Sequence, residues 1–179
     1  MNLSLCVFCA SSDHVSEIYN NAASELGAEM AAKRLTLIYG GGNNGLMGVL
    51  AETVHAKGGK IIGVIPQMLK DMGFAYKDAD KMIVTDGMRE RKAIMEERAH
   101  GFIGLPGGFG TLEEMLEIVT LKQLGVLEKP IVFLNVDGFF DGLLMQFERG
   151  YRERFIGEEC RDLYYVTDSV TEAVDYIVR

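Results

Sequence analysis

Glycines and carboxylates come together in one stretch of the chain, in a pattern suited to chemistry on a phosphate. The stretch runs from Gly107 to Glu114, reads GGFGTLEE, and follows the apolar run Gly101–Leu105. This order predicts a buried strand, a sharp glycine turn and the first turn of a helix. Backbone N–H groups at a helix start attract anions, and glycines let a ligand approach the backbone closely. We therefore interpret the stretch as a phosphate-binding turn with an acid one helical turn away.

The acid, Glu114, has two interpretations. The helix dipole favours an ionised carboxylate at this place, which suits a base or a group that stabilises positive charge. However, Thr111 and Glu114 also have the spacing of a capping box, in which both side chains serve only to begin the helix. The residues alone leave a catalytic and a structural role open.

A second glycine-rich loop, Gly40–Gly48, lies between an apolar run and a helical pattern. Gly40, Gly42 and Gly45 satisfy G-x-G-x-x-G, but dinucleotide binding also requires an acid about 20 residues later. The next apolar run is followed by Gln67 and holds no such acid, and the loop lacks the Lys-Ser or Lys-Thr pair of a P-loop. We expect a nucleotide or phosphate contact of another kind, with a purely structural turn as the alternative.

The segment that precedes Gly107–Glu114 in the chain carries a cationic side chain between apolar residues. Met88, Arg91 or Lys92, and Met95 fall on one face of a predicted helix. An arginine in such surroundings can hold a phosphate or a carboxylate with a bidentate fork. Alternatively, its stem packs on the methionines while its head pairs with a neighbouring glutamate.

Alternating strands and helices must position these residues. Apolar, β-rich runs recur along the chain, and most are separated by stretches of helical periodicity such as Ile18, Ala22, Leu26 and Met30. This alternation predicts one α/β domain over residues 1–179, with a parallel sheet of about seven strands and helices on both faces. The expected strands are Leu3–Cys9, Leu35–Tyr39, Lys60–Ile65, Lys81–Thr85, Gly101–Leu105, Pro130–Leu134 and Leu163–Val166.

Two further segments bear on the site and its frame. Ligands of open parallel sheets bind outside the carboxyl ends of the strands. Gln67–Asp80 follows such an end, so it is predicted to form a lid or a wall over the site, or else a simple surface excursion. Ser169 and Glu172 have capping-box spacing at the start of a closing helix.

Composition narrows the class of protein. The 179 residues carry a net charge of −8, which argues against nucleic acid as the main partner, while a small anion needs only a local positive pocket. No apolar run reaches the roughly 18 residues of a membrane helix, so no membrane association is expected. The start, Met1–Cys6, lacks the basic region of a signal peptide, which predicts a cytoplasmic protein.

Cysteines and histidines offer little chemistry. Cys6 and Cys9 form a C-x-x-C, but their spacing puts them on opposite faces of a predicted strand, where they act as small buried hydrophobes. His14, His55 and His100 show no metal spacing, so no metal site is predicted.

Taken together, Gly40–Gly48, Met88–Met95 and Pro106–Glu114 resemble the signatures of the LOG (LONELY GUY) family. Its members are cytokinin riboside 5′-monophosphate phosphoribohydrolases, long labelled "lysine decarboxylase-like". The resemblance covers nearly the whole chain, and M-x-x-R-K and P-G-G-x-G-T-x-x-E are its most specific parts. It implies a Rossmann-like fold and a homodimer with active sites near the subunit interface.

The resemblance also implies roles for single residues. Arg91 and Glu114 correspond to the catalytic pair of the family. Binding of the substrate and its 5′-phosphate would involve Gly42, Asn43, Gly45, Met88, Arg91, Lys92, Gly107, Gly108, Gly110, Thr111 and Thr120. One departure concerns Gly73, which stands where many members carry a glutamate that contacts the substrate. Recognition of the base or ribose on that side is therefore expected to differ.

The implied reaction hydrolyses the N-glycosidic bond of a nucleoside 5′-monophosphate, a cytokinin ribotide or AMP, and requires no cofactor. A lysine decarboxylase would need a lysine placed to form a Schiff base with pyridoxal phosphate, and nothing in the sequence places one. The alternative from another class is a non-catalytic nucleotide-binding or carrier module on the same fold.

Overall fold

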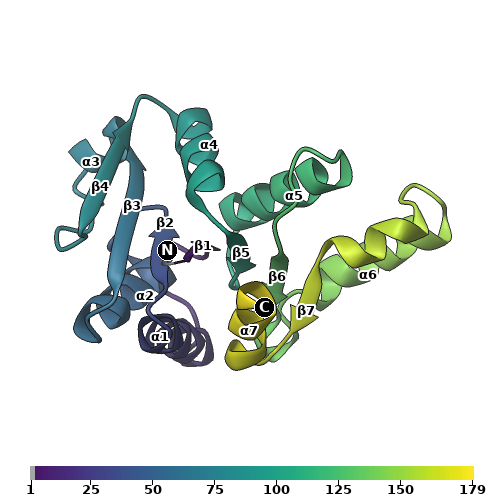
Figure 1. The fold of residues 1–179 in the computed structure, drawn as a ribbon, viewed down its shortest axis with the longest axis horizontal. Coiled ribbons are helices and arrows are strands. Elements are labelled where there is room, and N and C mark those ends of the chain that lie inside the picture. The colour runs from purple at the N-terminus through teal and green to yellow at the C-terminus, as the bar shows by residue number, and fades with distance from the viewer. Residues whose placement is uncertain (1–2) are drawn as a thin grey trace.

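A seven-stranded parallel sheet forms the centre of the molecule, as a computed structural model of residues 3–179 shows (Figure 1). The strand order is β4-β3-β2-β1-β5-β6-β7. The prediction that Met1–Cys6 is not part of a signal peptide rests partly on Met1 and Asn2, which lie outside the described residues. The strands are β1 (Ser4–Phe8), β2 (Thr36–Tyr39), β3 (Lys60–Pro66), β4 (Lys81–Thr85), β5 (Gly101–Gly104), β6 (Ile131–Leu134) and β7 (Tyr165–Thr167).

Helices cover both faces of the sheet (Figure 1). One face packs against α1, α2 and α7, and the other against α4, α5 and α6. None of the helices in residues 3–179 is long and apolar enough to cross a membrane. The helices are α1 (Glu17–Ala32), α2 (Gly45–Ala56), α3 (Gln67–Asp71), α4 (Met88–Arg98), α5 (Phe109–Gln123), α6 (Asp141–Arg152) and α7 (Val170–Val178), with short 3-10 turns η1 (Val136–Gly138) and η2 (Glu158–Leu163).

Two hydrophobic cores result, one on each face of the sheet. Leu26, Leu50 and Ile103 belong to the first core, and Phe102, Met115 and Phe133 to the second. Their neighbours in the central strands are nearly all buried, which is why the strands read as continuous apolar runs rather than alternating ones. The predicted α/β fold is confirmed. Cys6 and Cys9 lie in opposite cores, also as predicted.

The order of the strands changes direction at β1. From β1 the chain proceeds outward through β2, β3 and β4, then returns to place β5 on the other side of β1. Helix α4 makes this return, and it contacts β1, β2, β3 and β4 on the way. A site at the carboxyl ends of these strands is therefore built from both halves of the sheet.

The closing helix begins as its sequence predicts, with one difference. The Ser169 hydroxyl oxygen accepts the Glu172 N–H at 3.3 Å, as in a capping box. The Glu172 carboxylate, however, accepts from the Thr167 hydroxyl at 2.8 Å and not from Ser169. Leu163 ends η2 instead of beginning the last strand, so β7 is shorter than predicted.

Candidate active site

A cavity of about 380 Å³ opens at the carboxyl ends of the central strands. That volume lies in the range of small-molecule sites in proteins. It occupies the place where the strand order reverses, as expected for ligand sites in open parallel sheets. Its wall is made by Val7, Phe8, Cys9, Ala10, Ser11, Gly40, Gly42, Asn44, Met47, Ile65, Leu69, Phe74, Met88, Arg91, Gly108, Phe109, Gly110, Thr111, Glu113 and Glu114.

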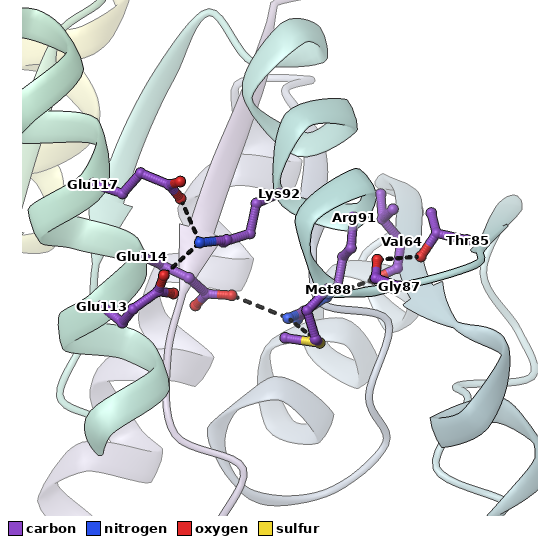
Figure 2. A network of polar contacts seen from close by, with 9 residues as sticks. All are labelled: Val64, Thr85, Gly87, Met88, Arg91, Lys92, Glu113, Glu114 and Glu117. Carbon is purple, nitrogen blue, oxygen red and sulfur yellow. Dashed lines mark hydrogen bonds and ion pairs between the residues drawn. The ribbon is translucent and has the colours of Figure 1, made fainter.

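A buried ion pair lies in this wall, formed by Arg91 of α4 and Glu114 of α5. Arg91 Nη1 donates to Glu114 Oε1 at 3.1 Å, and only 8% and 7% of the two residues is exposed (Figure 2). Arg91 Nε donates to the Val64 carbonyl oxygen of β3 at 3.0 Å. The guanidinium is thus fixed from the sheet and from α5 at once. Each interpretation of Arg91 is partly right. Its guanidinium pairs with a glutamate, and both side chains line the cavity.

The start of α4 is built to hold Arg91 in this position. Gly87 is the N-cap, and its carbonyl oxygen accepts both the Arg91 N–H at 3.1 Å and the Thr85 hydroxyl at 3.2 Å. The Glu90 carboxylate accepts the Asp86 N–H at 2.8 Å, which satisfies a backbone donor at the helix start. Arg91 therefore stands on the first turn of a helix that is tied to the end of β4.

The pKa of Glu114 is raised from 4.5 to about 7. Burial is the main cause, because the cavity floor offers little solvent to the ionised carboxylate, and the nearby Arg91 guanidinium offsets part of this effect. Glu113 raises the pKa further, while Lys92 lowers it. The prediction that the helix dipole keeps Glu114 ionised was wrong. Glu114 is buried and lies beyond the first turn of α5, so both of its protonation states are accessible near pH 7.

The capping-box interpretation of Thr111 and Glu114 was also wrong. Helix α5 starts at Phe109, and Gly108 is its N-cap with no side-chain cap. Thr111 is consequently the third residue of the helix, and Glu114 lies almost a full turn further in. Glu114 therefore does not cap α5. The contact that its carboxylate makes is the ion pair with Arg91.

The phosphate-binding interpretation of the glycine turn agrees with the geometry at the start of α5. A Cβ placed on Gly108 or Gly110 would meet no atom within 4 Å, so both glycines border open space at the cavity. A Cβ on Gly107 would instead overlap the Thr111 side chain, which is buried beneath the turn. The first N–H groups of α5 have no partner within the helix, and this end carries the positive pole of the dipole. An anion fits there.

The second glycine loop contributes only part of what was predicted. Gly42 lines the cavity, as do Gly40 and Met47. Gly45 does not, since its N–H donates to Asp13 Oδ1 at 2.6 Å where the chain enters α2. Asn43 is exposed and its side chain points to the Gly73 carbonyl oxygen at 3.4 Å. Asn44, which the sequence did not single out, lines the cavity instead.

Two more candidate residues lie away from the cavity wall. Lys92 forms ion pairs with Glu113 and, at 2.8 Å, with Glu117 (Figure 2). The Thr120 hydroxyl donates to the Leu116 carbonyl oxygen at 2.7 Å, and Thr120 lines a separate hollow of about 130 Å³ between α5 and the α6–η2 region. Within this chain, neither side chain joins Arg91 and Glu114 at the cavity.

The segment Gln67–Asp80 forms a wall of the cavity, as one of its two interpretations predicted. The Asn43 N–H donates to the Phe74 carbonyl oxygen and the Tyr76 N–H to that of Gly41, both at 2.9 Å. These bonds attach the segment to the second glycine loop, and Leu69 and Phe74 face the cavity. Nothing in the sequence assigned Leu69 and Phe74 to the site, because isolated apolar residues in such a segment carry no functional pattern. Phe109 was also overlooked, although an aromatic residue that is 94% exposed between two cavity glycines could have been found from its place in the motif.

Together, the sheet and the cavity at the point of strand reversal define an α/β protein of the Rossmann-like class, in which the start of helix α5 borders the cavity. A family model described as "Possible lysine decarboxylase" matches residues 47–177. The chain belongs to this family, which agrees with the resemblance seen in the sequence.

Relatives with assigned names share much of this chain. It is 41% identical over 170 residues to the cytokinin riboside 5′-monophosphate phosphoribohydrolase LOG5 of Arabidopsis thaliana, covering 95% of this chain and 75% of that protein. It is 42% identical over 170 residues to the corresponding LOG protein of Oryza sativa subsp. japonica, covering 95% and 70%.

Solved structures share the fold. The molybdenum cofactor binding protein of Rippkaea orientalis matches with a TM-score of 0.76 and 21% identity, covering 99% of this chain and 96% of that one. The Moco carrier protein of Chlamydomonas reinhardtii matches with a TM-score of 0.73 and 22% identity, covering 98% and 94%. At this identity the likeness concerns the architecture alone.

Proposed function

We propose that the protein hydrolyses the N-glycosidic bond of nucleoside 5′-monophosphates, releasing the free base and ribose 5-phosphate. The observation that carries the proposal is the buried Arg91–Glu114 pair, which shares one cavity with the open start of α5. The names of relatives about 40% identical to this chain support the same activity. AMP and cytokinin ribotides are the candidate substrates.

The cavity suits the two ends of such a substrate. A 5′-phosphate at the start of α5 would accept the N–H groups of the first turn, next to Gly108 and Gly110. The sugar would then lie toward Glu114, whose carboxylate is buried one and a half turns further along α5. Leu69, Phe74 and Met88 offer an apolar wall for the base.

Cleavage of a glycosidic bond passes through a sugar with oxocarbenium character. Ionised Glu114 would stabilise this cation and accept a proton from the attacking water. The carbon–nitrogen bond breaks and its electron pair leaves with the base, while the water oxygen bonds to the anomeric carbon. The proton that Glu114 has taken from this water then returns to solvent, and the base takes up one proton from solvent, so that neutral free base and ribose 5-phosphate are released. A carboxyl group with a pKa of about 7 is well matched to such proton transfer near neutral pH. Arg91 holds the carboxylate in place, and the chemistry requires no metal or organic cofactor.

The direct test measures free base released from AMP and from isopentenyladenosine 5′-monophosphate by chromatography. Glu114→Ala and Arg91→Ala should each lose most turnover while keeping the circular dichroism of the folded protein. Glu97→Ala and Arg98→Ala are matched controls, since both side chains are exposed at the far end of α4. Near-normal release of base by the Glu114 and Arg91 variants would refute the proposal. Stoichiometric binding without any release would instead favour the carrier module.

The assembly and location of the protein are part of the same proposal. The family resemblance supports a homodimer, and a cytoplasmic location is proposed with it. Light scattering coupled to size-exclusion chromatography gives the mass in solution, where a value near twice 19.8 kDa supports the dimer. Fractionation of cells that express the tagged protein tests the location.

A further inference from the structure

Gly40 lies beside Arg91, although the backbone conformation at position 40 does not require a glycine. Its φ lies outside the left-handed region, whereas the next residue, Gly41, has a φ of 73°. An alanine could therefore adopt the backbone conformation of Gly40, but not that of Gly41 without strain. The reason for a glycine at position 40 must lie in the space around its Cα.

That space is occupied by the guanidinium of Arg91. A Cβ added to Gly40 would overlap Nη2 of Arg91, and it would lie 3.1 Å from Cζ and 3.1 Å from the Met47 sulfur. The guanidinium thus rests on the bare Cα at the carboxyl end of β2, while its other nitrogens bond to β3 and α5. Gly40, the Val64 carbonyl and the Glu114 carboxylate enclose it from three directions.

We propose that Gly40 is a positioning residue, whose missing side chain sets where the Arg91 guanidinium stands against Glu114. A methyl group there leaves Arg91 no room in its present place, because Nε and Nη1 are both already engaged. The guanidinium must then retreat by roughly 1 Å, a misplacement that can cost a catalytic site about 100-fold in rate. The catalytic part of this inference rests on the proposed hydrolase activity, whereas the packing part does not.

The first test needs no enzymatic activity. The Glu114 carboxyl group is titrated by carbon-13 NMR in the wild type, in Gly40→Ala and in the control Gly142→Ala, where an added Cβ meets nothing within 4 Å. Moving the Arg91 guanidinium away from Glu114 weakens the main influence that lowers the pKa of Glu114. Its pKa should therefore rise above about 7 in Gly40→Ala and stay at the wild-type value in Gly142→Ala. An unchanged pKa in Gly40→Ala would overturn the proposal.

The second test is a double-mutant cycle on stability with Gly40→Ala, Arg91→Lys and the two combined. A lysine lacks Nη2 and ends near the position of Cζ, so it leaves room for the methyl group. Urea unfolding should show a clear loss for Gly40→Ala in the wild type and a much smaller loss in the Arg91→Lys background. If Gly40→Ala alone does not fold, recovery of the fold by Arg91→Lys supports the contact. Equal losses in both backgrounds, or a combined variant that also fails to fold, would contradict it.

The catalytic consequence is measured last. Gly40→Ala should lower kcat about 100-fold with a smaller change in KM, because the phosphate contacts at α5 are left intact. A methyl group that merely blocked the cavity would raise KM instead, and that result would overturn the positioning role. If the wild type releases no base while the first two tests succeed, the proposed function fails and the placement of Arg91 by Gly40 stands.

Discussion

Glu114 makes the stability of the folded protein depend on pH in a way that can be isolated by one substitution. Its pKa rises from 4.5 to about 7 on folding. Each pKa unit corresponds to about 1.4 kcal/mol, so the buried ionised carboxylate costs about 3 kcal/mol of folding free energy. The side chain is only 9% exposed, so solvent screens little of this cost.

The direction of the effect follows from the proton balance. Between pH 4.5 and pH 7 the folded protein holds the Glu114 proton while the unfolded chain has already lost it. Stability contributed by this group is therefore complete below pH 4.5 and declines as the pH rises through the window to about 7. Glu114→Gln removes the ionisable group while keeping an oxygen that can accept from Arg91.

Urea unfolding from pH 4.5 to pH 8 gives the free energy of unfolding of the wild type and of Glu114→Gln. Relative to the wild type, the variant should gain about 3 kcal/mol across this range. Other groups titrate in both proteins, and their contributions cancel in the difference. Glu97→Gln, with an exposed carboxyl on α4, should show no such gain. A difference between wild type and Glu114→Gln that stays constant with pH would refute the assignment of a raised pKa.

Three further predictions concern the partner of Glu114, the start of α5 and the start of α7. Arg91→Met should destabilise the protein by about 1 kcal/mol more at pH 8 than at pH 6, because loss of the guanidinium raises the pKa of Glu114 and keeps its proton bound in the folded protein over this range; urea unfolding at both pH values measures this. Gly108→Ala should lower the melting temperature only slightly, as alanine is a poorer N-cap than glycine, but weaken AMP binding about tenfold, ~1.4 kcal/mol by calorimetry, since its methyl group would stand in open space at the cavity. Ser169→Ala should cost about 1 kcal/mol through the lost α7 cap, with kcat/KM unchanged.

Much of the fold could be predicted from the sequence because the sheet is buried on both faces. Runs such as Leu35–Tyr39 are apolar at nearly every position, and glycines or charges mark their ends, so each strand was located to within a few residues. Leu163 was assigned to the last strand but lies at the end of η2. Its apolar side chain packs beside the hollow there and does not belong to the sheet.

The site was harder to predict, since it depends on contacts between distant residues. Arg91 and Glu114 are 23 residues apart, and they meet because α4 and α5 both cover the same face of the sheet. The start of α5 was misplaced because Gly108 can cap a helix without a side chain, which removes the usual signal. The raised pKa of Glu114 could not be foreseen either, because burial is a property of the assembled cavity.

The reversal of strand order at β1 also affects when the site can form during folding. β1 pairs with β2 early in the chain, but its other edge meets β5 only across about 96 residues, from Leu5 to Gly101. Contacts between such distant segments form slowly, because a long loop must close first. On the ribosome, a nascent chain that ends before Gly101 would hold an unpaired apolar strand edge and an arginine without its glutamate. The pairing of β5 with β1 and the completion of the cavity are thus joined late steps, so newly made protein should acquire ligand binding and resistance to proteolysis together.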